Sequence, residues 1–229
     1  MKNHQPRRQH LLEVASQLFS DHGYHNTGVD TITKHSGVSK TTLYKYFDTK
    51  EDLILETLEI QHHRIIKLFE SYIEASQRKH PNYLPHQHIP SIFDATKDWR
   101  SEKDFTGCKF INASAEYSDP NDPIHQCAAK HELAQKEIIF DLLSELPKKQ
   151  ARSLSEQIAI LIDGAIVVAQ IRADKTTIDA ARLTLETLLK QHFTVKTWTK
   201  WLAFLNRGFK YRACVKGNNK SKYISQPVL

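Results

Sequence analysis

A single glycine between two short apolar segments places the tightest constraint on how this chain can fold. Gly37 separates a segment anchored by Ile32 from one anchored by Leu43. The spacing predicts two short helices, and a glycine permits the tight turn that sets them at a steep angle. Ser39 stands where an N-cap side chain accepts a hydrogen bond from the first free amides of the second helix. Residues 28–47 therefore predict a helix-turn-helix. The predicted shared core consists of Leu18, Phe19, Ile32, Val38, Leu43 and Phe47.

The rest of the chain also carries apolar residues at helical spacing, and no segment alternates as a half-buried strand does. Asp122 before Pro123 is typical of a helix start, and Pro147 of a helix end. A stretch rich in proline and histidine between about residues 78 and 91 predicts a solvated loop. The fold class predicted is all-α. The predicted helices span residues 11–22, 29–35, 40–44, 50–77, 92–100, 107–117, 123–146, 151–173 and 177–193.

The charge of the chain does not by itself indicate nucleic acid. The net charge is +6, but nine lysines and arginines and no acids follow Glu186. Without these nine, 23 of the 32 basic residues remain against 26 acidic ones, a net charge of −3 for residues 1–186. DNA binding must therefore be argued from a motif rather than from the basic isoelectric point.

Other bulk features favour a cytoplasmic protein. The N-terminus has no apolar stretch of a signal peptide, and no run approaches the roughly 18 apolar residues of a membrane span. Three cysteines without CxxC spacing argue against a disulfide framework and a thiolate zinc site. We find no Ser-His-Asp elbow, P-loop, GxGxxG or HExxH motif, so an enzyme is not expected.

The outer faces of the helix-turn-helix carry hydrogen-bonding side chains of modest bulk, which can reach base edges in the major groove. They are Lys40, Thr41, Thr42, Lys45 and Tyr46. Lys50 begins the following helix, where its ammonium and the free amides can both face a phosphate.

The segment resembles the DNA-binding domain of TetR-family repressors over about residues 7–55. The places of the family pattern are filled by Ile32, Gly37-Val38-Ser39, Thr42-Leu43-Tyr44, Tyr46-Phe47 and Lys50-Glu51. The resemblance implies that Lys40, Thr41 and Lys45 face bases. It also implies that the residues that mainly contact phosphates are Thr42, Tyr44, Tyr46 and Lys50. Thr27, just before the first of the two helices, is also expected to contact DNA. Gly28 departs from the family, which usually has Ser or Thr there. The alternative is a structural three-helix unit with no role in DNA binding.

The resemblance implies three regions. Residues 5–53 would form the three-helix DNA-binding domain, and residues 54–193 a helical domain for ligand binding and dimerisation. Residues 194–229 form a basic, aromatic extension unlike the family. The helices 151–173 and 177–193 would pair with their copies in a homodimer, because the first is apolar around too much of its circumference for one buried side. The partner would be double-stranded operator DNA with an inverted repeat. The alternative is that these helices are merely central in a monomer.

The expected function is a repressor that an unidentified small molecule releases from its operator. The alternatives are a constitutive DNA-binding regulator or activator without an effector, and a cysteine-based redox or electrophile sensor. Cys108 carries the sensor hypothesis because it follows Gly107 at a helix start, although a small buried hydrophobe is the competing interpretation. The histidines form no cluster at ligand spacing, so neither a metal nor a cofactor is expected. Candidate residues of the effector pocket are Phe69, Tyr72, Trp99, Phe105, Cys108, Tyr117 and Phe140, each of which could also be plain core.

Overall fold

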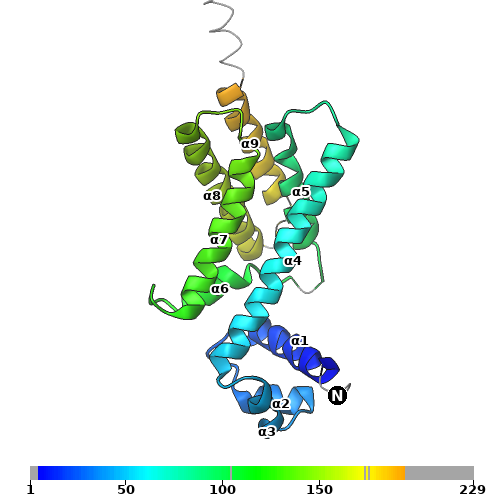
Figure 1. Cartoon of the computed structure of the whole chain (residues 1–229), viewed down its shortest axis with the longest axis vertical. Coiled ribbons are helices and arrows are strands. Elements are labelled where there is room, and N and C mark those ends of the chain that lie inside the picture. The colour runs from blue at the N-terminus through cyan, green and yellow to red at the C-terminus, as the bar shows by residue number, and fades with distance from the viewer. Residues whose placement is uncertain (1–4, 104, 173, 175, 194–229) are drawn as a thin grey trace, which may run out of the picture. The chain divides into compact units, whose positions relative to one another are not determined.

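The computed structural model describes residues 5–103, 105–172, 174 and 176–193. Every regular element in this part of the chain is a helix, which confirms the all-α class (Figure 1). The described residues up to Leu189 form one compact unit. The elements are α1 (Gln5–His22), α2 (Val29–Ser36), α3 (Lys40–Tyr46), α4 (Lys50–Lys79), the 3-10 helix η1 (Pro85–His88), α5 (Pro90–Arg100), α6 (Lys109–Glu116), α7 (Pro123–Asp141), α8 (Lys148–Arg172) and α9 (Thr177–Phe193).

Helices α1 to α3 and the first turns of α4 enclose one small core. Ile32 of α2 and Leu43 of α3 are fully buried, and Phe47 closes the end of α3. Gly37 ends α2 with a φ of 65°, a left-handed conformation that only glycine adopts without strain. The predicted turn between α2 and α3 therefore forms as expected. Val38, predicted to lie in this core, is only half-buried because it faces a surface hollow described below.

Helix α4 belongs both to this unit and to the helices that follow it. Thr49 and Asp52 begin it with reciprocal hydrogen bonds, the Thr49 side chain accepting from the Asp52 amide and the Asp52 carboxylate from the Thr49 amide. Its 30 residues correspond to about 45 Å at 1.5 Å per residue. Leu53 and Leu58 are buried near the end that packs on α1, and Phe69 is buried farther along.

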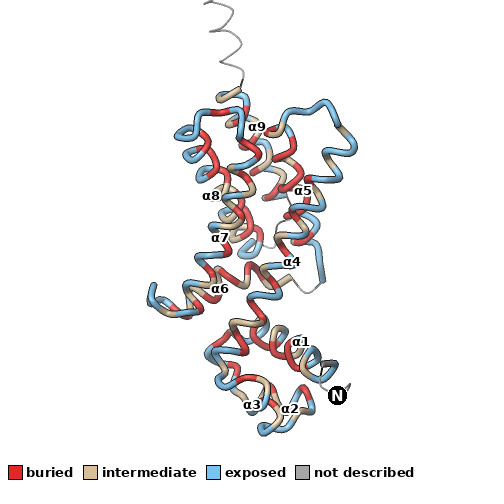
Figure 2. Tube along the Cα trace, in the orientation of Figure 1, coloured by how far each residue is buried: buried red, intermediate tan, exposed pale blue. Residues whose placement is uncertain are grey.

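The second core lies among α4, α5, α7 and α8. Helix α7 packs against α4, α6 and α8, and α5 against α4 and α8. The buried faces of these helices turn toward one another, whereas their outer faces are exposed (Figure 2). Fully buried apolar side chains from all four helices fill this core, among them Phe69, Phe93, Ile92, Ile139, Leu154 and Ile158.

Two sequence predictions for this region were wrong in detail. Helix α7 ends at Asp141 rather than at Leu146, although Leu143 is fully buried. Apolar residues continue beyond the helix because the turn also contributes to the core. The proline- and histidine-rich loop is not simply solvated. The His86 ring N–H donates a hydrogen bond to the Glu145 carboxylate at 2.6 Å, and the His88 ring pairs with the Ser76 hydroxyl at 2.9 Å. Both histidines are buried. The predicted extension at 194–229 lies outside the described residues.

Candidate nucleic-acid interface

Helix α3 presents one buried and one exposed face. Leu43 fixes it to the core, while Thr41, Tyr44 and Lys45 are exposed. Tyr44 has an exposed fraction of 48%, which is high for an aromatic side chain. One face of α3 is thus fixed in the core, and the opposite face carries hydroxyl and ammonium groups. These groups can form hydrogen bonds to base edges and contact phosphates.

The start of α3 is fixed by its own side chains. The Ser39 hydroxyl accepts a hydrogen bond from the Thr42 amide at 3.2 Å, which confirms the predicted cap. The hydroxyls of Ser39 and Thr42 also lie 2.9 Å apart in a hydrogen bond. Thr42 is half-buried, and its hydrogen bonds to Ser39 stabilise the first turn of α3. A contact between Thr42 and a phosphate stays a prediction.

Two candidate lysines have partners inside the protein. The Lys40 ammonium lies 2.5 Å from the Asp30 carboxylate, and the hydrogen bond and charge of Asp30 raise the pKa of Lys40. Both side chains are exposed, so this ion pair contributes little to stability and can exchange for a phosphate. The Lys50 ammonium donates to the backbone oxygen of Tyr24 at 3.1 Å. Tyr46 is half-buried, edge-on to the Phe47 ring.

Thr27 requires a correction. Its side chain is 1% exposed, and its hydroxyl donates to the carbonyl oxygens of Gly23 at 2.7 Å and Leu18 at 3.2 Å. A hydroxyl committed to two backbone carbonyls holds the α1–α2 connection in place and does not face DNA. The sequence pattern could not distinguish these roles, because a threonine before a short helix serves either.

Helix α6 is connected to α1 and to the α1–α2 connection by contacts that sequence reasoning missed. The Glu116 carboxylate accepts hydrogen bonds from the amides of Tyr24 at 2.8 Å and His25 at 2.7 Å. At the other end of α6, the Lys109 ammonium donates to the Ser16 hydroxyl at 2.7 Å. The Tyr24 hydroxyl donates to the Lys109 carbonyl at 3.1 Å. No local pattern reports such contacts, since the partners lie 85 to 93 residues apart.

The candidate effector residues do not gather at one place. Tyr117 packs against Tyr24 and His25, beside the start of α7. Phe140 lies near the opposite end of that helix, under the Arg152 guanidinium. His125, which bonds the Tyr117 carbonyl, and Phe140 are 15 residues apart, or about 22 Å along a helix.

The other candidates are mostly packed residues. Phe69 is fully buried, and the Trp99 ring meets the Phe105 ring edge-on. The Tyr72 hydroxyl donates to the Asp98 carboxylate. The assignment of these residues to an effector pocket stays a prediction.

Cys108 is buried at the start of α6, with an exposed fraction of 4%. Burial raises the pKa of its thiol to about 12, although the amides of Ile111 and Phe110 favour the thiolate. Glu132 and Asp163 raise this pKa further, because both are ionised at the high pH where such a thiol would lose its proton. The expected helix-start effect is therefore present but smaller than the cost of desolvation, and the thiol form predominates at neutral pH.

Two carboxyl groups meet between α7 and α8. Burial, the charge of Asp163 and a hydrogen bond to Asp163 raise the pKa of Glu132 to about 8. Burial also raises the pKa of Asp163, while the hydrogen bond from Glu132 opposes this. Glu132 therefore holds the proton and donates it to the Asp163 carboxylate. Its other oxygen, Oε1, is buried without a hydrogen-bond partner.

Two histidines of α4 and α7 pair with each other. His62 and His131 share a hydrogen bond between their Nδ1 atoms at 2.9 Å, and His131 stacks on Phe110. Within the described residues, no group of three or more His, Cys, Asp or Glu side chains could hold a metal ion.

Comparison with known proteins decides the family. Residues 11–57 match the family described as bacterial regulatory proteins, tetR family, and residues 85–183 match the LmrA/YxaF-like C-terminal domain of transcriptional regulators. The transcriptional activator FasR of Mycolicibacterium smegmatis is 32% identical over 166 residues, covering 69% of this chain and 70% of FasR. The chain belongs to the TetR family.

Further relatives agree with this assignment. The transcriptional regulator YxaF of Bacillus subtilis is 27% identical over 173 residues, which cover 74% of this chain and 87% of YxaF. The crystal structure of the TetR-family regulator SCO4454 from Streptomyces coelicolor has a TM-score of 0.71 and 25% identity, covering 81% of this chain and 95% of that one. TetR-family proteins are DNA-binding transcriptional regulators rather than enzymes, and this chain is one of them.

Proposed function

We propose that this TetR-family regulator is a cytoplasmic repressor that binds an inverted-repeat operator as a homodimer and is released by a small-molecule effector. Lys40, Thr41 and Lys45 would contact bases, and Tyr44, Tyr46 and Lys50 phosphates, with Thr42 assisting through its hydroxyl. The effector would bind among α4 to α8, and no cofactor is required.

One observation carries the effector response. Helix α6 holds the α1–α2 connection through Glu116 and contacts α1 through Lys109. The residues just before α6 are held by α8, where the Gln170 amide donates to the Thr106 carbonyl at 2.9 Å. A ligand that favours a different packing of α6 would change the position of the DNA-binding helices. Affinity for the operator would fall by the ligand's differential binding energy for the two states.

The outer face of α8 and α9 supports the homodimer. Ile160 and Leu183 have exposed fractions of 62% and 66%, and an apolar groove of about 510 Å³ lies between the two helices. Helix α8 is long and apolar enough to span a membrane by composition alone, and 39% of its most apolar window is buried. In a DNA-binding regulator, a second copy of the chain is the occupant that removes such a face from water and presents two recognition helices.

An activator is the second candidate, favoured by the similarity to FasR, whose name describes an activator. The two functions use the same DNA contacts and differ in where the operator lies. A regulator bound to a site that overlaps the promoter blocks the polymerase, whereas a regulator bound upstream recruits it.

The test is selection of bound sites from genomic DNA, followed by a reporter fused to each bound promoter. We expect an inverted repeat that overlaps a promoter, and higher expression when the regulator is deleted. Lower expression on deletion would overturn repression and favour the activator. Tyr44→Ala and Lys50→Ala should weaken binding to all sequences, whereas Lys67→Ala, an exposed lysine on α4, should not. A changed base preference in either variant would contradict its phosphate role.

The dimer has a separate test. Ile160→Lys should give the mass of one chain by light scattering and lose affinity for the full inverted repeat, because Ile160 lines the apolar groove and the lysine places a charge there. Leu133→Lys is the matched control, since Leu133 is 53% exposed on α7 and outside the groove. A wild-type protein that binds the full operator as a single chain would refute the homodimer.

A further inference from the structure

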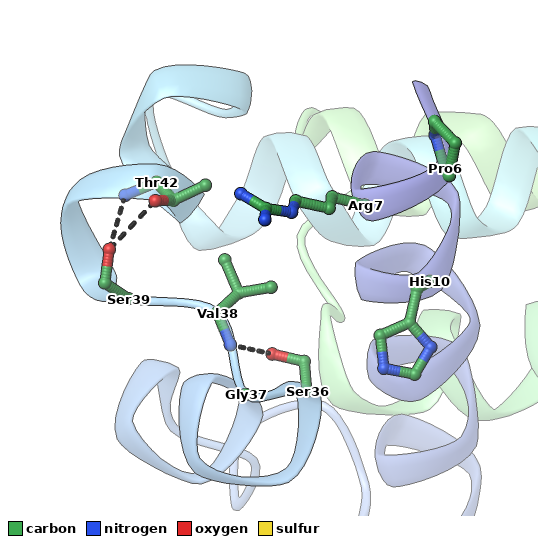
Figure 3. A pocket seen from close by; sticks show the side chains of 8 residues that line it. All are labelled: Pro6, Arg7, His10, Ser36, Gly37, Val38, Ser39 and Thr42. Atoms are coloured by element: carbon green, nitrogen blue, oxygen red, sulfur yellow. Dashed lines mark hydrogen bonds between the residues drawn. The ribbon is translucent and has the colours of Figure 1, made fainter. Parts of the chain in front are cut away.

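A hollow of about 450 Å³ lies between the first turns of α1 and the turn that connects α2 to α3 (Figure 3). Its lining includes no carboxylate. From α1 come Pro6, Arg7 and His10, and from the helix-turn-helix come Ser36, Gly37, Val38, Ser39 and Thr42. The hollow therefore lies between the helix-turn-helix and α1, a helix for which no DNA contact was predicted from the sequence.

Two neighbouring arginines of α1 have opposite environments. Arg8 forms an ion pair with Glu56 of α4, and its guanidinium lies 5.1 Å from the centre of the Phe47 ring. Arg7 is turned about 100° from it around the helix and is exposed. Within the described residues Arg7 makes no ion pair or hydrogen bond. Its side chain extends from α1 toward the start of α3 and ends opposite Thr42 (Figure 3).

The groups around Arg7 suit an anion that accepts several hydrogen bonds. His10 follows one turn later on the same side of α1 and offers a ring N–H. The hydroxyls of Ser39 and Thr42 lie across the hollow from it. A guanidinium with no carboxylate nearby is an unneutralised charge, and its planar fork matches the oxygens of a phosphate.

We propose that this hollow binds one phosphate of the DNA backbone beside each half-site, with Arg7 as its charged contact and His10 as a second donor. The inference rests on the proposed DNA binding and extends its footprint from α3 to α1. Thr42 belongs both to the hollow and to the predicted contacts of α3, so the two surfaces are continuous. A duplex held by α3 delivers a phosphate to this edge, whereas a free phosphate ion would have only one cation to hold it.

The first experiment measures operator affinity by fluorescence anisotropy at several salt concentrations. One phosphate contact changes the slope of log K against log salt by about 0.9, which corresponds to about fivefold in affinity at 0.15 M salt. Arg7→Ala should show both the smaller salt slope and the lower affinity, and to the same extent on operator and on unrelated DNA. Arg7→Lys should recover the slope because it keeps the charge. Arg78→Ala is the matched control, since Arg78 pairs with Glu74 near the far end of α4.

The second experiment replaces single phosphates of the operator by uncharged methylphosphonates. One position beside each half-site should weaken the wild type but have little further effect on Arg7→Ala, while other positions weaken both proteins equally. Equal effects at every position, or an unchanged salt slope in Arg7→Ala, would overturn the proposal. Competition by millimolar inorganic phosphate that Arg7→Ala abolishes would also overturn it, in favour of a free-ion site. A wild type that selects no DNA sequence would instead refute the proposed function.

Discussion

Glu116 gives a quantitative test of how α6 is joined to the DNA-binding helices. Glu116→Ala removes the acceptors of two hydrogen bonds, at 2.8 Å from the Tyr24 amide and 2.7 Å from the His25 amide. A hydrogen bond to a charged group contributes roughly 1.5–3 kcal/mol, and less where water competes. The Tyr24 bond is part-buried and the His25 bond exposed. We therefore expect the junction to lose about 2–4 kcal/mol of free energy.

Amide hydrogen exchange measures this loss where it occurs. Exchange of the Tyr24 and His25 amides should accelerate by a factor of ten or more, since about 1.4 kcal/mol corresponds to tenfold. Exchange in the middle of α8 should be unchanged. Glu116→Gln keeps one acceptor oxygen and should lie between the wild type and Glu116→Ala.

Gly23 gives an independent route to the same result. It has a φ of 85°, and a Cβ there would lie 2.9 Å from the Glu116 carboxylate. Gly23→Ala should therefore displace the carboxylate and accelerate the same amides. Unchanged exchange in Glu116→Ala would refute the idea that this contact holds the junction.

Three further predictions concern single side chains. Cys108→Ser should leave DNA release by oxidants unchanged, because burial keeps the thiol protonated with a pKa of about 12; release by the wild type that the variant lacks would make the protein a redox sensor. Folding favours protonated Glu132, whose pKa rises from 4.5 to about 8. The stability that it contributes is thus present below pH 4.5 and lost as the pH rises toward 8. Glu132→Gln should therefore unfold at a higher temperature than the wild type at pH 8 and show a flatter pH dependence, and an unchanged profile would contradict this. Gly28 caps α2 without a side chain and has open space around its Cβ position, so Gly28→Ser should stabilise the protein by a few tenths of a kcal/mol in denaturant unfolding. A loss of stability would mean that the serine fails to cap α2.

The parts of the structure that local chemistry determines were predictable from the sequence. Ser39 and Asp122 cap helices as expected, and Gly37 makes its turn, because each acts on residues within a few positions along the chain. The outward face of α3 follows from the same periodicity that buries Leu43.

Contacts between distant segments were not predictable in this way. Thr27 bonds to the end of α1 rather than to DNA, and nothing in its neighbours distinguishes these roles. Glu116 meets its partners only after α6 has packed beside the α1–α2 connection. Aromatic residues chosen as pocket candidates were spread over both ends of α7, because apolar spacing reports burial but not which core a residue enters.

The continuity of α4 has a consequence for exchanging domains between regulators. The predicted boundary at residue 53 lies inside this helix, so a chimaera joined there must keep helical phase. One added residue turns the following segment by about 100°, which moves its buried side out of register. Seven added residues restore the phase to within about 20° but lengthen the helix by about 10 Å, beyond the reach of Glu116 for the Tyr24 amide. A functional chimaera therefore requires a junction that conserves the length of α4. The α6 of the regulator that supplies the C-terminal part must also carry an acceptor for the backbone amides of the new α1–α2 connection.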